Sequence, residues 1–262
     1  MASEGETNGV RRERDKGWRF DLVLPVLLRP RKTLAHIIEL KRPNWRTPLL
    51  LLVVAAVIAA VVAGSIKAAA AASGEMSLPP DFEFYTPEMQ AQFMQAATAT
   101  NTPTFNYILP ALGAALGVLV QWFLIGWALH LLLTMLGGRG TNQDALNIAA
   151  WSTVPALLRS AVQIVAMLAN DRLIASPGLS GFAPAREGVG FALLAGLLAA
   201  VDIYLIWQIV LLVIGARLSS QLTRGKSIIA VLVTMLIVLL LWGLPAALMS
   251  QFEGLNVIQP FF

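Results

Sequence analysis

Two charged side chains, Arg159 and Asp202, lie inside long apolar runs of this sequence, and their position calls for a chemical reason. An isolated charge in the middle of a bilayer costs several kcal/mol, so each of them needs a partner. They could form a structural ion pair that fixes which helices touch, or they could line a polar path.

The depths of three polar side chains agree with such a cluster. At 1.5 Å per residue, Arg159 lies roughly 15 Å, Asp202 roughly 21 Å and Gln121 roughly 20 Å from the outer ends of their apolar runs. We therefore expect Arg159, Asp202 and Gln121 to form one intramembrane polar cluster. A structural role is favoured, because few other polar residues accompany them.

The rest of the sequence offers little material for catalysis. There are no Cys residues and only two His residues, which excludes thiol catalysis and zinc–thiolate sites and leaves few ligands for any other metal. The G-x-S-x-G, H-E-x-x-H and Walker A motifs are absent. An intramembrane aspartyl protease needs two Asp residues at membrane depth, and only Asp202 qualifies. We expect no enzyme activity, no cofactor and no metal site.

The elements that must position these residues are membrane helices. The chain is 57% hydrophobic and 13% charged, whereas about 25% of residues are charged in an average soluble domain. Apolar runs of about 18 or more residues are typical of membrane spans. Five such runs predict an all-α polytopic membrane helical bundle over residues 48–250, with five transmembrane helices at about 48–66, 108–136, 145–169, 188–214 and 228–249.

The distribution of Lys and Arg predicts the orientation of the bundle. Eleven of the 19 cations precede the first run, and four more fall in the connections between the second and third and between the fourth and fifth runs. The opposite side has three, and Arg159 lies within a run. Because cytoplasmic flanks are rich in cations, we expect a multi-pass protein of the cell membrane with a cytoplasmic N-terminus. The C-terminal tail, residues 251–262, is then external.

The N-terminal region divides into two parts. Residues 1–17 are polar and mixed in charge, as expected of a flexible cytoplasmic tail. Residues 18–47 alternate short apolar stretches with cations, which is typical of short helices lying in the membrane interface. This segment could dock anionic lipid or a protein partner, or it could serve orientation alone. Its basic membrane-surface patch consists of Arg29, Arg31, Lys32, Lys41, Arg42 and Arg46.

Two further features concern packing and the first external loop. Gly113 and Gly117 form a small-xxx-small face that allows close helix packing, either within one chain or in a homo-oligomer. The sequence Thr86-Pro87-Glu88 combines a capping hydroxyl, an N1 proline and an early acid. It predicts one external amphipathic helix from Pro87 to about Ala97.

Several motifs, taken in order, resemble the Yip family, which is named for eukaryotic members that interact with Ypt/Rab GTPases. The chain is similar to a bacterial member of this family from about Phe20 to Met249. The matching elements are Leu28-Arg-Pro-Arg-Lys32, Thr86-Pro-Glu-Met89, Leu136-Gly-Gly-Arg-Gly-Thr141, Trp151-Ser-Thr-Val-Pro155, and Tyr204-Leu-Ile-Trp207 leading to Ile214-Gly215 and Lys226. The resemblance implies a five-helix membrane protein with a cytoplasmic N-terminal region. It supplies no catalytic residues.

Two functions therefore remain open. The first is a non-enzymatic membrane scaffold of the bacterial inner membrane that binds anionic lipids or a membrane protein partner through its basic segment. Since bacteria lack the Rab machinery, the trafficking role of eukaryotic members is not expected here. The second is a small-solute or ion transporter or channel with a polar path at Gln121, Arg159 and Asp202. Nucleic acid is not an expected ligand, because no soluble basic domain is present.

Overall fold

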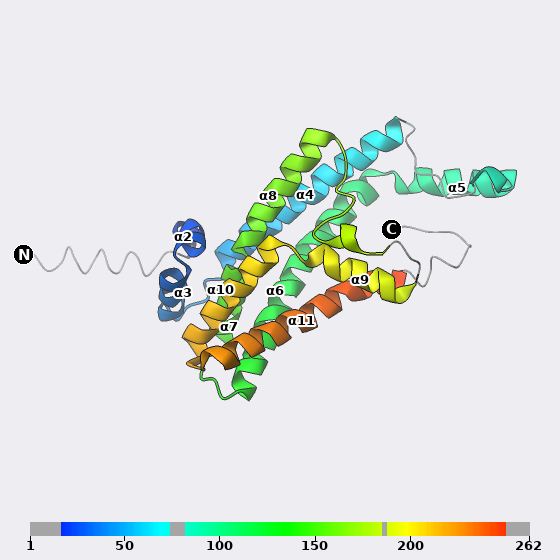
Figure 1. Cartoon of the computed structure of the whole chain (residues 1–262). Helices are drawn as coiled ribbons and strands as arrows, with labels where there is room; N and C mark the ends of the chain where they lie inside the picture. The colour runs from blue at the N-terminus through cyan, green and yellow to red at the C-terminus, as the bar shows by residue number, and fades with distance from the viewer. Residues whose placement is uncertain (1–16, 74–81, 185–187, 250–262) are drawn as a thin grey trace, which may run out of the picture. The chain divides into compact units, whose positions relative to one another are not determined.

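The computed structural model describes residues 17–73, 82–184 and 188–249, and within these ranges all regular secondary structure is helical (Figure 1). Residues 1–16 of the predicted N-terminal tail and the whole predicted C-terminal tail lie outside the described residues. Five helical stretches are long and apolar enough to cross a membrane: Arg46–Ala72, Thr104–Met135, Asn142–Asn170, Ile203–Ser220 and Arg224–Leu244. The predicted fold class, an all-α bundle with five membrane helices, is confirmed.

The first two spans are single long helices. Helix α4 covers Arg46–Ala72. A turn of π-helix, Thr104–Ile108, leads without interruption into α6, Leu109–Met135. The first helix extends beyond the predicted run, 48–66, at both ends. The second begins before the predicted run, 108–136, and ends at Met135. The fifth span, α11, covers Arg224–Met249.

The third span is interrupted at Thr153, between α7 (Asn142–Ser152) and α8 (Val154–Asn170). Proline causes this interruption: Pro155 has no N–H to donate to a carbonyl four residues earlier, and its ring crowds the preceding turn. The chain tightens there, with Thr153 N–H bonded to Ala150 O and Ala156 N–H bonded to Thr153 O.

The fourth apolar run, predicted as one span over residues 188–214, forms two helices in the structure. Helix α9 covers Val189–Ala200, and α10 covers Ile203–Ser220. Val201 between them has an extended backbone, with φ −87° and ψ 112°. Neither glycine nor proline occurs at this break. The carbonyl groups at the end of α9 instead make contacts outside the helix, which are described below.

Two short helices precede the first span, as predicted for the basic segment. A 3-10 turn at Phe20–Leu22 leads into α2, Val23–Leu28, and then α3, Pro30–Glu39. The predicted helix after Thr86 is also present as α5, Pro87–Thr100, and Thr86 Oγ1 accepts a hydrogen bond from Met89 N–H at 3.3 Å. A last 3-10 turn occupies Ser180–Phe182.

The chain divides into two compact units. The first contains Met1–Leu52, Val118–Leu158 and Ile203–Val238, and the second contains Val53–Gly117, Arg159–Asp202 and Leu239–Phe262. Helices α4, α6, α8 and α11 each contribute residues to both units.

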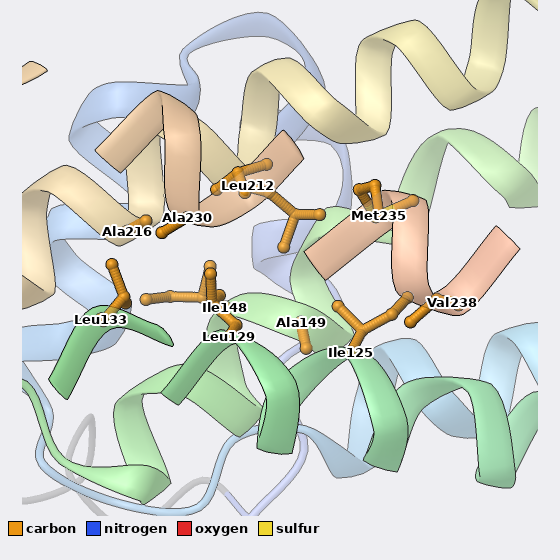
Figure 2. Close-up of a cluster of buried hydrophobic side chains, with 11 residues drawn as sticks. Ile125, Leu129, Leu133, Ile148, Ala149, Leu212, Ala216, Ala230, Met235 and Val238 are labelled. Carbon is orange, nitrogen blue, oxygen red and sulfur yellow. The ribbon is translucent and has the colours of Figure 1, made fainter. Parts of the chain in front are cut away.

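The first unit has a dense apolar core. Figure 2 shows its side chains turned toward one another from α6, α7, α10 and α11. Two glycines of this unit allow the helices to approach closely. A Cβ atom at Gly126 would lie 2.6 Å from Leu146 Cδ2, and one at Gly215 would overlap Ile148. The buried members of the core are Ile125, Leu129, Leu133, Ile148, Ala149, Leu212, Ala216, Ala230, Val231, Met235 and Val238.

Candidate functional site

The basic N-terminal segment, residues 18–47, is packed against the other helices of the first unit, and we call it the platform. Its helices α2 and α3 are joined to α7 and the start of α8 by a second buried cluster, in which Trp151 is fully buried. On α2 and α3, residues at helical spacing turn toward this cluster while their neighbours face outward. The cluster consists of Leu22, Val26, Leu34, Ile37, Trp151 and Val154, with Ile214 of α10 packed against it.

Polar contacts fix both ends of the platform. At its start, the Arg19 N–H donates to Thr47 Oγ1 at 2.8 Å, and the Arg19 guanidinium contacts Asp21 and His36. At its end, the buried Asn147 side chain accepts from Asn44 N–H at 2.8 Å and donates to Arg42 O at 2.9 Å. Because backbone groups need partners when buried, Asn147 holds the linker before α4 in one conformation.

The six cations of the predicted patch are all exposed on this platform: Arg29, Arg31, Lys32, Lys41, Arg42 and Arg46. Three of them, Arg29, Arg31 and Lys32, line an open hollow of about 420 Å³ together with Pro30 and Ile214. Their backbone is well fixed, since Thr33 bonds to Arg29 O through both its N–H and its hydroxyl. The arrangement is suited to binding an anion by charge.

The second candidate feature is the ion pair, which lies in the second unit. Arg159 Nε is 2.9 Å from Asp202 Oδ2, and the two side chains are 28% and 16% exposed. Arg159 also donates from Nη2 to Ala199 O at 3.1 Å. One guanidinium thus contacts both the carboxylate after the helix break and a carbonyl at the end of α9.

These contacts explain where α9 ends. The last carbonyls of a helix have no partner within it and must be satisfied from outside. Leu179 N–H donates to Leu198 O at 2.9 Å, while Arg159 serves Ala199 O. Gly178, at φ +59°, brings the preceding loop so close that a Cβ there would lie 2.6 Å from Ala199 O. The cation at a helix C-terminus is also favoured by the helix dipole.

The remaining predicted residues, Gln121, Gly113 and Gly117, are all in α6. Gln121, in α6, belongs to the first unit, where its side chain is half-buried. Its membership of the polar cluster stays a prediction. In the second unit, Gly117 faces α11, since a Cβ there would lie 3.2 Å from Trp242 Cη2. A Cβ at Gly113 would meet no described atom within 4 Å, so close packing within the described chain involves Gly117 and not Gly113.

Sequence reasoning missed Asn147, Thr47 and the burial of Trp151. Asn147 stands in a run with Ala, Ile and Leu neighbours, and a polar residue at that position was a usable signal of a buried hydrogen-bond partner. Thr47 gave no signal, because a threonine at a helix start is common. Among the described residues, His, Asp and Glu form no group of three or more that could hold a metal ion.

Comparison with known proteins supplies the family. A search of curated proteins and a search of solved structures each found no significant match. A model of the Yip1 domain matches residues 24–245, which include α3, all five candidate spans and the Arg159–Asp202 pair. The match covers most of the chain and agrees with its five apolar helices, so this multi-pass membrane protein belongs to the Yip1 domain family.

Proposed function

We propose that this chain is a non-enzymatic membrane scaffold whose platform binds an anionic membrane surface on the cytoplasmic side. The observation that carries the proposal is the platform itself: six exposed cations stand on a segment whose helices α2 and α3 are packed against a buried core. A cation near an anionic membrane surface contributes about 1 kcal/mol. Cations on a fixed support act together, without the entropic cost of ordering a flexible tail.

The proposed orientation rests on the charges of the two units. The first unit carries 15 of the 19 Lys and Arg residues, whereas the second carries 4. Positive residues accumulate on the cytoplasmic side of membrane proteins. This supports a cytoplasmic N-terminus and an external α5.

The absence of cysteine from the chain makes the orientation easy to test. Lys32→Cys on the platform and Phe84→Cys before α5 each introduce one exposed thiol. A membrane-impermeant maleimide should label the Phe84→Cys protein in intact cells and the Lys32→Cys protein only after lysis. The reverse labelling pattern would contradict the proposed orientation.

A transporter is the second candidate, and the broken helix at Asp202 is the observation that favours it. Discontinuous membrane helices line the substrate sites of many transporters. Against this, Arg159 satisfies both the carboxylate and the adjacent carbonyl, as a structural role requires. Flux into proteoliposomes that Asp202→Ala abolishes would favour transport, and no flux across a broad panel of solutes and ions would count against it.

A further inference from the structure

The hollow on the platform combines three cations with apolar surface. Arg29, Arg31 and Lys32 line it, and no described acidic side chain forms an ion pair with any of the three. The hollow is wide open and has a volume of about 420 Å³. Guanidinium groups are well suited to phosphate because they can donate two parallel hydrogen bonds.

The fold holds this hollow in place. Arg29 N–H donates to Pro25 O at 2.7 Å, closing the turn between α2 and α3. On the inner side, Leu34 and Ile37 are fully buried in the cluster with Trp151. Ile214 of α10 both packs against that cluster and lines the hollow. The cations therefore project from a backbone that is anchored to α7 and α10.

An apolar face on α2 and the turn before it indicates what kind of phosphate fits. Phe20, Leu24 and Leu28 follow one another at intervals of four residues and are 53%, 63% and 70% exposed. Trp18 stacks on Phe20 with ring centroids 6.1 Å apart. Leu22 and Val26, between them, face the buried cluster. Exposed aromatic and aliphatic side chains beside cations are typical of segments lying in a membrane interface.

We propose that the hollow binds the phosphate of an anionic phospholipid, while Phe20, Leu24 and Leu28 contact its acyl region. This inference rests on the proposed function and sharpens it: the platform has one saturable lipid site in addition to a diffuse attraction of its charges. A soluble phosphate compound would find the same cations but would leave the apolar face uncovered.

The test compares two triple variants of the full chain, purified in a neutral detergent. R29Q/R31Q/K32Q removes the cations of the hollow, and K41Q/R42Q/R46Q removes the same charge from the rest of the platform. Retained phosphatidylglycerol is counted by native mass spectrometry, with phosphatidylcholine as the neutral control. At about fivefold per cation, R29Q/R31Q/K32Q should lose about a hundredfold in affinity for phosphatidylglycerol. K41Q/R42Q/R46Q should lose much less.

The outcomes separate the two proposals. Equal losses in both variants would leave the charged platform standing and overturn the lipid site. No loss in either variant would overturn both. Binding confined to a copurified protein, with no retained lipid, would identify a protein ligand instead and overturn both.

A second comparison tests the apolar face and the lipid source. L24Q/L28Q keeps every cation, so it should reduce phosphatidylglycerol retention without changing the response to inorganic phosphate. If inorganic phosphate displaces the lipid at equal concentration, the site takes free phosphate and the lipid proposal is wrong. Should a triple variant elute as aggregate, single Arg29→Gln and Arg46→Gln variants provide the same comparison at about fivefold.

Discussion

The two units of the molecule are built from the same kind of apolar helix but are stabilised differently. Among the described residues, 24 apolar side chains are buried, and all except Met167 belong to the first unit. Every buried polar side chain among the described residues also belongs to the first unit. The second unit instead has an ion pair at a helix break and leaves most of its large apolar side chains exposed.

The difference indicates a division of tasks. In a bilayer, lipid chains cover exposed apolar side chains as well as another helix would, so helices associate through close packing and polar contacts. The first unit uses close packing, with glycines at the contacts and Asn147 fixing the platform. The second unit relies more on polar contacts, with the ion pair between Arg159 and Asp202 at the break between α9 and α10. The loss of stability caused by a substitution should therefore depend on which kind of contact it removes in each unit.

The largest expected effect comes from breaking the ion pair in the second unit. Asp202→Ala leaves the Arg159 charge uncompensated and partly buried, and removing one partner of such a pair costs about 3–5 kcal/mol. Thermal unfolding in detergent should show a strongly lowered midpoint. The double variant Arg159→Leu/Asp202→Leu should recover much of the loss, although Ala199 O still lacks its donor. Equal damage from single and double variants would mean that the two charges do not stabilise one another.

A smaller effect should follow from filling a glycine contact in the first unit. Gly215→Ala places a Cβ against Ile148 inside the core, and overpacking of this kind costs about 1–3 kcal/mol. Gly113→Ala in the second unit is the matched control, because its Cβ would meet nothing within 4 Å. Its unfolding midpoint should equal or slightly exceed that of the unchanged protein, because Ala is a better helix former than Gly. Loss of stability in Gly113→Ala would indicate that this position packs against a second copy of the chain.

Features of the fold and of the candidate site that depend on local composition could be predicted from the sequence. Features that depend on contacts between distant segments could not. Long apolar runs fix the number of spans. The break between α7 and α8 was not predicted, although Pro155 was a usable signal for it. The cost of a charge in an apolar run was enough to suggest Arg159 and Asp202 as partners. The break beside Asp202 could not be predicted, because contacts from Arg159 and from the loop at Leu179 end α9 there.

The platform shows the same limit. Its cations and its short helices followed from the alternation of apolar stretches with Lys and Arg. Its attachment did not, because periodicity alone cannot tell whether an apolar face meets lipid or protein. In the structure, Val26 and Leu34 meet Trp151, whereas Leu24 and Leu28 stay exposed. That choice depends on α7 and α10, which are distant in the sequence.

The smallest expected effects concern two helix caps, one in each unit. Thr141 caps α7 in the first unit through a reciprocal pair of hydrogen bonds with Asp144, and Thr86 caps α5 in the second. Replacing either by Ala should cost its helix about 1 kcal/mol. For Thr141→Ala the loss should appear as a global midpoint lowered by a few degrees, because α7 contributes Ile148 and Trp151 to the buried clusters.

For Thr86→Ala the global midpoint should not change, since α5 has no buried residue. The loss should appear only as faster amide hydrogen exchange within Pro87–Thr100, because a helix with few buried contacts opens locally at low free-energy cost. An equal drop of the global midpoint in both variants would show that α5 is as firmly integrated as α7. In that case α5 would be an exception to the weaker packing of the second unit, while the conclusions on the ion pair and the platform would not change.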